Sequence, residues 1–237
     1  MKKLLLMALL VAPFVAVNAE QAKGKKKGEK GFISLFDGKS LKGWKVNTEN
    51  PKSITVKDGN IVIDGPRAHL FYAGDVADAN FKNFVFRAQV KTFPKANSGI
   101  YFHTKYQAKG WPDAGFEAQV NNTHGDPKKT GGLYAVKDVN PAPAKDGEWF
   151  NYEIRVKGKK IAIKINGKVT SSWTEVPNAP HLKSMPGRKL GSGTFALQAH
   201  DPQSVVHYRN IRVLSLIHIS EPTRRTPISY AVFCLKK

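Results

Sequence analysis

The chain has 237 residues, of which 41% are hydrophobic and 10% aromatic, and it contains one cysteine. This composition supports a packed core and excludes global disorder, an internal disulfide framework and a multi-cysteine metal site. The formal net charge is +20, but the basic residues of the body are spread over turns and strand faces, so we expect no nucleic-acid interface.

Residues 1–19 have the pattern of a secretory signal peptide. A Lys-Lys pair precedes an apolar run from Leu4 to Val17, and small residues around Ala19 form a cleavage site. The apolar run is short for a membrane span and contains Pro13. We therefore expect export to the periplasm or the extracellular space of a bacterium, without a transmembrane span. An uncleaved anchor is the alternative.

Residues 20–31, with the sequence EQAKGKKKGEKG, are rich in Lys and Gly and show no apolar period. We interpret this segment as a solvated linker. The lysines from Lys23 to Lys30 are suited to contact with an anionic envelope surface.

The body of the chain, residues 32–213, alternates apolar and polar residues with a period of two and has almost no helical period. Such alternation predicts β-strands, and the Asp58-Gly59 and Asn166-Gly167 pairs predict tight hairpins. Many short strands separated by Gly, Pro and Asn predict an all-β fold, a two-sheet antiparallel sandwich of jelly-roll type. The expected strands cover residues 32–36, 54–56, 61–63, 84–90, 100–103, 116–120, 133–135, 152–156, 161–165, 194–200 and 205–213, with one more beginning at 169.

Residues 214–237 read LSLIHISEPTRRTPISYAVFCLKK, with no turn pattern and no alternation that continues the preceding strand. They resemble the translation of a DNA sequencing adaptor. We interpret them as an appended read-through segment, which would make Cys234 foreign to the natural protein. A genuine tail is the alternative.

Three of the expected strands carry polar side chains opposite their apolar ones. Successive side chains of a strand point to opposite faces, so the polar ones gather on one face. If the three strands lie in one sheet, that face is suited to hydrogen-bonding a polyhydroxylated ligand; an ordinary solvent-facing surface is the alternative. The residues concerned are Tyr101, His103, Glu117, Gln119, Asn121, Gln198 and His200.

Tryptophans in or near loops add aromatic planes on which a sugar ring can stack, namely Trp44, Trp111 and Trp149. His124 follows the strand at 116–120 and is as consistent with a site as with a structural role.

Glu117, Gln119 and Asn121 occupy positions i, i+2 and i+4 of one strand, the spacing at which retaining β-glucanases on jelly rolls carry acidic residues. Retaining hydrolysis needs two carboxyl groups about 5 Å apart. Only Glu117 is acidic here, which disfavours ordinary double displacement.

Six segments in the expected order carry a resemblance to the 3-keto-disaccharide hydrolase domain of secreted bacterial proteins. The resemblance implies a concanavalin-like jelly roll over residues 32–213 and cleavage of glycosides oxidised at the 3-position. The chain departs from the family pattern at His103 and at Asn121-Asn122. The segments are GFISLFDGKSLKGW (31–44), NSGIYF (97–102), GFEAQV (115–120), TGGLY (130–134), LQAH (197–200) and YRNI (208–211).

The implied chemistry is elimination followed by hydration. A 3-keto group acidifies the neighbouring C2 proton, so one base, donors for an enolate oxygen and one acid suffice. On this resemblance Glu117 or His200 is the base and His103 the acid. The residues expected to bind the sugar are Tyr101, Trp111, Gln119, Asn121, Tyr134 and Gln198.

No cofactor follows from the sequence, and a divalent metal on Glu117 and the histidines is an alternative that no motif supports. The rival function is a non-catalytic carbohydrate-binding module that uses the same polar face. An envelope-anchoring module bound through the Lys-rich segment is the third hypothesis.

Overall fold

The computed structural model describes residues 30–216. The expected signal peptide, the linker up to residue 29 and the tail from residue 217 lie outside the described residues, so these assignments stay predictions. No helix between residues 30 and 216 is both long enough and apolar enough to cross a membrane.

Thirteen strands and three short 3₁₀ segments form the described part of the chain. The 3₁₀ segments are Pro51–Ser53, Val76–Ala79 and Pro180–Lys183. The strands are β1 (Ile33–Ser34), β2 (Trp44–Val46), β3 (Ile54–Lys57), β4 (Asn60–Asp64), β5 (Ala68–Tyr72), β6 (Phe84–Thr92), β7 (Ser98–Thr104), β8 (Phe116–Val120), β9 (Phe150–Lys157), β10 (Lys160–Ile165), β11 (Lys168–Thr174), β12 (Thr194–Ala199) and β13 (Val205–Ser215).

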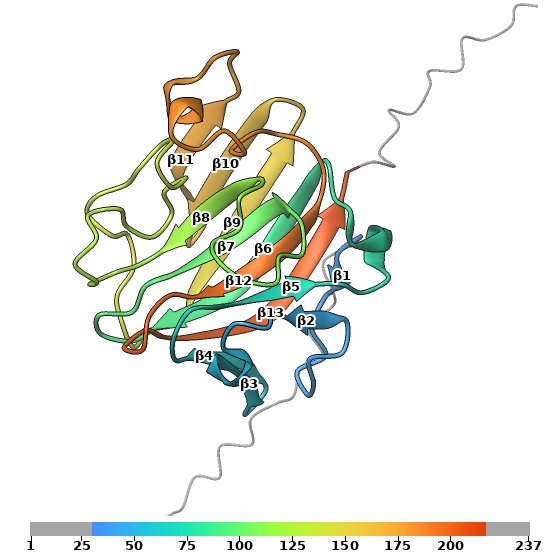
Figure 1. The fold of residues 1–237 in the computed structure, drawn as a ribbon, viewed down its shortest axis with the longest axis vertical. Coiled ribbons are helices and arrows are strands. Elements are labelled where there is room, and N and C mark those ends of the chain that lie inside the picture. The colour runs from blue at the N-terminus through green and yellow to red at the C-terminus, as the bar shows by residue number, and fades with distance from the viewer. Residues whose placement is uncertain (1–29, 217–237) are drawn as a thin grey trace, which may run out of the picture. The chain divides into compact units, whose positions relative to one another are not determined.

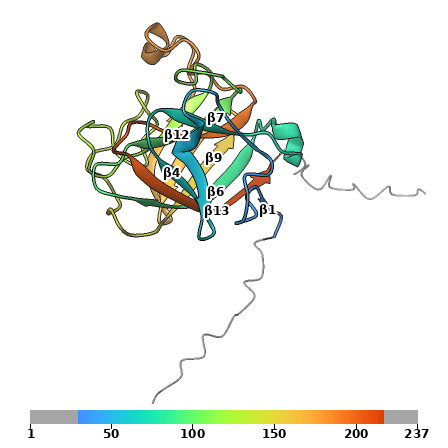
Figure 2. The ribbon, with the colours of Figure 1, turned by 60° about the horizontal axis from the view of Figure 1, so that its bottom comes forward.

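The strands form two antiparallel sheets that lie face to face (Figure 1). The larger sheet has eight strands in the order β11-β10-β9-β6-β13-β4-β3, with β1 also paired to β13. The smaller sheet has five strands in the order β2-β5-β12-β7-β8. In the turned view, β7 and β12 lie on one side of the sandwich, with β6 and β13 on the other (Figure 2). The predicted two-sheet antiparallel sandwich is confirmed.

The two sheets bury side chains in different ways. On the larger sheet, β9 alternates between buried residues such as Ile154 and solvent-accessible ones such as Arg155. On the smaller sheet, every residue of β5, β7, β8 and β12 is buried. One face of the smaller sheet packs on the aromatic core, so its other face must be covered by loops. The polar face expected from the sequence is therefore not a solvated sheet surface.

The structure differs from the predicted strands in three places, at β2, at β5 and at residues 133–135. β2 has three residues and was not expected. β5 was not expected because it is buried on both faces and its AHLFY sequence does not alternate. The strand expected at residues 133–135 is wrong: Leu133 makes only isolated bridges to Ala118 and Lys137, and the chain turns at Ala135, where φ is 58°.

The last strand also extends past the expected domain boundary at Val213. Leu214 lies opposite Val85 and Ser215 opposite Phe84 in the pairing of β13 with β6. The described strand thus includes two residues of the segment 214–237, whose origin remains a prediction.

Candidate functional site

A cavity of about 620 Å³ opens over the polar face of the smaller sheet. Its floor consists of side chains from β7, β8 and β12, and its walls come from loops on either side. The floor residues are Tyr101, Glu117, Gln119 and Gln198, and the wall residues include Asn97, Trp111, Tyr134, Met185, Arg188 and His200.

Strand register brings the floor residues together. Tyr101 of β7 lies opposite Glu117 of β8 on one side and opposite Ala196 of β12 on the other. Because side chains alternate, Gln198 falls on the same face two residues beyond Ala196. The expectation that these three strands share one sheet is confirmed.

Glu117 is the only ionisable carboxylate on this floor, and it is 5% exposed. Its Oε2 atom accepts hydrogen bonds from the Tyr101 hydroxyl at 2.8 Å and from Arg188 Nη2 at 3.2 Å. Its Oε1 atom accepts one from Gln198 Nε2 at 3.2 Å. The Arg188 guanidinium also lies over the Tyr101 ring, 5.3 Å from its centroid. We call these four residues the Glu117 cluster.

Two glycines allow this cluster to form. A Cβ atom at Gly99, the β7 residue opposite Gln119, would overlap the carboxylate of Glu117. A Cβ atom at Gly187 would overlap the backbone carbonyl of Asp113. The first glycine gives the carboxylate room above the sheet, and the second lets the loop that carries Arg188 pack closely against the loop from β7 to β8.

Burial dominates the proton affinities of the cluster. Desolvation raises the pKa of Glu117, although Arg188 and the hydrogen bonds from Tyr101 and Gln198 oppose the shift. Burial, followed by the nearby charge of Glu117, raises the pKa of Tyr101 well above its usual range. Glu117 therefore retains a proton at higher pH than an exposed glutamate does.

Several buried polar atoms around the cavity have no hydrogen-bond partner among residues 30–216. Gln119 Nε2 donates to Asn97 Oδ1 at 2.9 Å, which fixes the amide, but Gln119 Oε1 has no partner there. The same holds for Gln198 Oε1 and Arg188 Nη1. A buried polar atom without a partner costs about 1–3 kcal/mol. Two acceptors and one cationic donor are thus available to a hydroxylated ligand.

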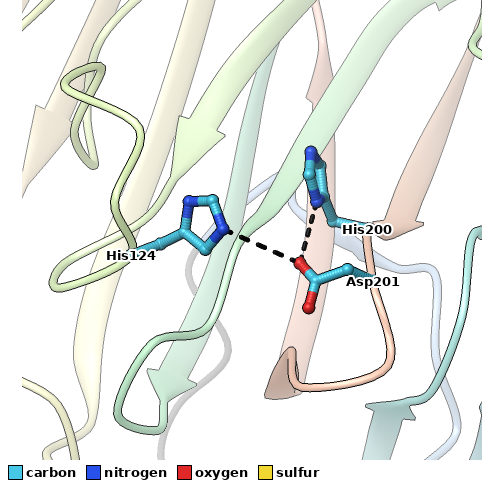
Figure 3. A group of neighbouring side chains, drawn as sticks. All are labelled: His124, His200 and Asp201. Carbon is cyan, nitrogen blue, oxygen red and sulfur yellow. Dashed lines mark hydrogen bonds and ion pairs between the residues drawn. The ribbon is translucent and has the colours of Figure 1, made fainter.

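His200 and Trp111 lie next to each other in the cavity wall. Their rings lie 5.1 Å apart with 35° between the planes, and Trp111 is 42% exposed. His200 Nδ1 lies 2.9 Å from Asp201 Oδ2, and His124 Nε2 lies 3.9 Å from the same oxygen (Figure 3). These three residues are the one group in the described chain whose spacing would suit a metal ion.

His69 of β5 lies beneath this wall and is fully buried, with edge-on ring contacts to Tyr101 and Trp111. Neither of its ring nitrogens has a hydrogen-bond partner in the described chain. Burial lowers the pKa of His69 to about 4, so the ring is neutral near pH 7. It acts as part of the aromatic support under Trp111.

Most of the residues expected from the sequence line the cavity. Tyr134 does so from a turn, where its backbone N–H donates to the Glu117 carbonyl at 2.9 Å. The residues brought together are Tyr101, Trp111, Glu117, Gln119, Tyr134, Gln198 and His200.

His103 lies outside the cavity. Its φ of 56° interrupts the strand alternation, and its ring packs against Phe84 and Phe102. Its Nε2 atom lies 2.9 Å from the Lys82 carbonyl, and its Nδ1 atom accepts a hydrogen bond from the Gly191 N–H. With both nitrogens occupied away from the cavity, His103 does not occupy the position expected of an acid.

Asn121 also lies outside the cavity lining. Its amide donates to the carbonyls of Asp126 and Lys128 at 3.0 and 2.9 Å, and it accepts a bond from the His124 N–H. It shapes the loop that carries His124 rather than the floor of the cavity.

Two of the expected tryptophan platforms lie elsewhere. Trp44 is buried, and its Nε1 donates to the Leu35 carbonyl. Trp149 is covered by the Arg209 guanidinium, 3.9 Å from its ring. Of the three, Trp111 alone lines the cavity.

Sequence reasoning missed Arg188 and Asp201. Arg188 lies in a loop without periodicity, so no pattern links it to β8. Asp201 directly follows the LQAH segment, and that adjacency was the one signal for it in the sequence.

Comparison with known proteins gives a matching domain family and a similar named protein. The 3-keto-alpha-glucoside-1,2-lyase-like domain matches residues 31–214. A Bacteroides thetaiotaomicron protein named 3-keto-disaccharide hydrolase is 26% identical over 227 residues, which cover 77% of this chain and 78% of the relative.

Solved structures agree on the fold. A candidate glycosyl hydrolase from Parabacteroides distasonis aligns with a TM-score of 0.67 and 24% identity, over 78% of this chain and 94% of that one. The carbohydrate binding module CBM66 from Bacillus subtilis aligns with a TM-score of 0.52 and 10% identity, over 73% and 96% of the two chains.

Proposed function

The chain belongs to the 3-keto-alpha-glucoside-1,2-lyase-like domain family, and from that premise we propose that it cleaves the glycosidic bond of 3-keto-glucosides and 3-keto-disaccharides by elimination and hydration. The observation that carries the proposal is the Glu117 cluster, a buried carboxyl group with one guanidinium and two neutral donors on the floor of a cavity. The name of the Bacteroides relative supports the same substrate class.

The reaction needs one base and one acid. The base takes the C2 proton, and the electron pair of that bond forms an enolate whose charge rests on the 3-keto oxygen. Collapse of the enolate expels the C1 oxygen, which takes a proton from the acid. Water then adds at C1 and C2 regains a proton, so the net change is hydrolysis.

Glu117 and His200 supply this acid–base pair. Both line the cavity, and an electrostatic interaction between them contributes to the pKa of Glu117, so the two groups lie within electrostatic reach of each other. Arg188 presents a guanidinium to the enolate oxygen, since its Nη1 has no partner among the described residues. A cation held where negative charge develops lowers the barrier.

The rest of the cavity suits the sugar. Its volume of about 620 Å³ lies within the usual range of ligand pockets. Gln119 Oε1 and Gln198 Oε1 can accept hydrogen bonds from sugar hydroxyls, and the exposed Trp111 ring can stack on a sugar face.

Turnover of a 3-keto-glucoside, measured against the unoxidised glucoside, tests the proposal. We expect release of the aglycone and of 3-keto-glucose from the first substrate, and no reaction of the second. Tight binding of unoxidised sugars without turnover of the keto compound would make the protein a carbohydrate-binding module. Absence of both binding and turnover would refute the site.

We propose that the enzyme acts outside the cytoplasm, because residues 1–19 have a signal-peptide pattern. Intact-mass measurement of the protein from its producing cell tests this. A mature chain that begins at Glu20 is expected, and a mass that retains Met1 would contradict export with cleavage.

A further inference from the structure

We propose that Asp201 is a positioning residue that holds His200 in the tautomer whose Nε2 accepts a proton, which makes His200 the base and leaves Glu117 as the acid. The inference rests on the proposed function for the identity of the reaction. The tautomer itself does not depend on any substrate.

The hydrogen bonds of Asp201 determine where the His200 proton lies. Asp201 Oδ2 lies 2.9 Å from His200 Nδ1 and accepts a bond from Ser204 Oγ at 2.6 Å, while Oδ1 accepts one from the Gln203 N–H at 2.9 Å. Burial raises the pKa of Asp201, but the hydrogen bonds from Ser204 and His200 together bring it below its usual value. The carboxylate is therefore ionised at neutral pH and can only accept, so His200 Nδ1 carries the proton.

The second nitrogen of His200 is then a free acceptor. In Figure 3 Nε2 lies on the side of the ring away from Asp201. His200 lines the cavity, and Trp111 packs against its ring at 5.1 Å. This places an unprotonated imidazole nitrogen beside the substrate space, with a carboxylate behind it to stabilise the imidazolium that forms.

His124 favours a hydrogen-bonded arrangement over a metal site. Its Nδ1 accepts a hydrogen bond from the Asp126 N–H at 3.0 Å and lies 3.4 Å from Asn97 Nδ2. With two donors facing Nδ1, the proton of the neutral ring lies on Nε2, which faces Asp201. A metal ion between these residues would need the lone pair of that same Nε2. The ring proton would then move to Nδ1, and Nδ1 could no longer accept the hydrogen bond from the Asp126 N–H.

The catalytic step follows from this geometry. His200 Nε2 takes the C2 proton and becomes an imidazolium held by Asp201. The C2–H electron pair passes into the enolate, and the same Nε2 returns the proton to C2 during hydration. Glu117 gives its proton to the departing C1 oxygen and regains one from the water that adds at C1, so His200 and Glu117 both end the cycle in their starting states.

Asp201→Asn tests the inference because the structure predicts how the amide will sit. The Gln203 N–H donates to the Oδ1 atom of Asp201 and needs an acceptor there. The amide oxygen of the introduced asparagine therefore takes the Oδ1 position, and its NH₂ group takes the Oδ2 position. That NH₂ group donates to His200 Nδ1 and forces the proton onto Nε2. We expect kcat for a 3-keto-glucoside to fall about 10²–10⁴-fold, with KM changed no more than a few-fold.

Nitrogen-15 NMR of labelled histidine reads the tautomer directly in the free protein. The chain has seven histidines, each with two ring-nitrogen signals. The pair of signals that disappears in His200→Gln belongs to His200. We expect a protonated Nδ1 in the wild type and a protonated Nε2 in Asp201→Asn. A merely structural role for Asp201 would not reverse these signals.

Asp37→Asn is a matched control. Asp37 Oδ1 accepts from the Lys39 N–H and Oδ2 from Ser40 Oγ, the same local turn that Asp201 makes with Gln203 and Ser204, but without a histidine. We expect a similar change in thermal stability in both variants and no change of kcat in Asp37→Asn.

An unchanged tautomer or an unchanged kcat in Asp201→Asn would overturn the positioning role. Wild-type activity that is lost in EDTA and restored by Mn²⁺ or Zn²⁺, with the His200 signals shifting on metal addition, would overturn it in favour of coordination. A protein that shows the expected tautomer reversal but never turns over the keto substrate would refute the proposed function while the effect of Asp201 on His200 stands.

Discussion

Two glutamates, one on each sheet, show how differently this sandwich uses the same side chain. Glu153 of β9 lies on the outer face of the larger sheet, where Arg87 and Lys164 contact its carboxylate at 2.7 and 3.2 Å. Glu117 of β8 lies on the covered face of the smaller sheet with one cation, Arg188, at 3.2 Å. The Glu153 carboxylate has two cationic neighbours and access to solvent. The Glu117 carboxylate has one cationic neighbour and almost no access to solvent.

The difference in burial between Glu153 and Glu117 distinguishes a solvated sheet surface from a functional site. Exposed ion pairs contribute about 0–1 kcal/mol and are common on sheet surfaces. A buried ion pair is often no better for stability than an apolar pair of the same volume, so stability alone does not account for the Glu117 cluster. Buried ionisable groups with shifted pKa values are common at functional sites. Glu117 is such a group, and it lines the cavity.

The largest effect is expected for Glu117→Gln, which keeps the size of the side chain and removes the proton that Glu117 gives to the leaving oxygen. We expect kcat for an alkyl 3-keto-glucoside to fall about 10²–10⁴-fold. The loss should be smaller for a nitrophenyl 3-keto-glucoside, because a good leaving group needs no acid. Steady-state kinetics on the two substrates measures the difference.

His200→Gln is the counterpart that tells the acid from the base. Loss of the base slows removal of the C2 proton whatever the leaving group, so both substrates should lose the same factor. If Glu117→Gln also slowed both substrates equally, the acid role of Glu117 would be wrong. Equal losses in rate and in affinity would mean that Glu117 only holds the sugar.

Removing the cation from the buried cluster should cost more stability than any change at Glu153. Arg188→Met removes the cation beside the Glu117 carboxyl group, which must then stay charged without a partner or take up a proton, so we expect a loss of up to about 3–5 kcal/mol. Urea unfolding near pH 7 measures the loss. The double variant Arg188→Met/Glu117→Gln should recover most of it, since no buried charge remains. A double variant as unstable as Arg188→Met would show that the arginine stabilises through packing instead.

The covered face should also make stability depend on pH. Folded His69 stays neutral down to about pH 4, whereas an unfolded histidine takes up a proton near pH 6.5. The unfolded state binds more protons between these values, so His69 lowers stability by up to about 3 kcal/mol as the pH falls from 6.5 to 4. Burial raises the pKa of Glu117 above 4.5, which acts in the opposite direction because protonation there favours the folded state.

His69→Leu isolates the first contribution. The stability difference between this variant and the wild type should shift toward the variant as the pH falls from 6.5 to 4, and should stay constant below that. Urea unfolding at several pH values gives the difference. A difference that does not change with pH would mean that His69 finds a proton-stabilising partner in the folded state.

The part of the molecule that alternates was the part the sequence could predict. Period-two patterns indicated the strands of the larger sheet and the shared face of Tyr101, Glu117 and Gln198, because alternation converts directly into sidedness. β5 was missed because a strand buried on both faces has no polar alternation.

The remaining site residues could not be predicted for different physical reasons. Arg188 reaches Glu117 from a loop 71 positions away in the chain, and loop conformation leaves no periodic trace. His103 lies outside the cavity lining, and its positive φ is a local backbone feature that a strand pattern does not encode. Asp201 lay beside a recognised motif, and only its hydrogen bond to His200 gives it a role.

The smallest effect should come from Glu153→Gln, the counterpart of Glu117→Gln on the outer face. The side chains of Arg87 and Lys164 are about one-third exposed, so water and salt already screen their attraction to Glu153. We expect a stability loss of about 1 kcal/mol or less, a smaller loss in 1 M salt, and a kcat within two-fold of the wild type. The variant keeps a hydrogen-bond acceptor for the Arg87 side chain, which limits the loss further. A loss of 3 kcal/mol or more at Glu153 would mean that the two faces are equally desolvated, and the distinction between surface and site drawn from these glutamates would fail.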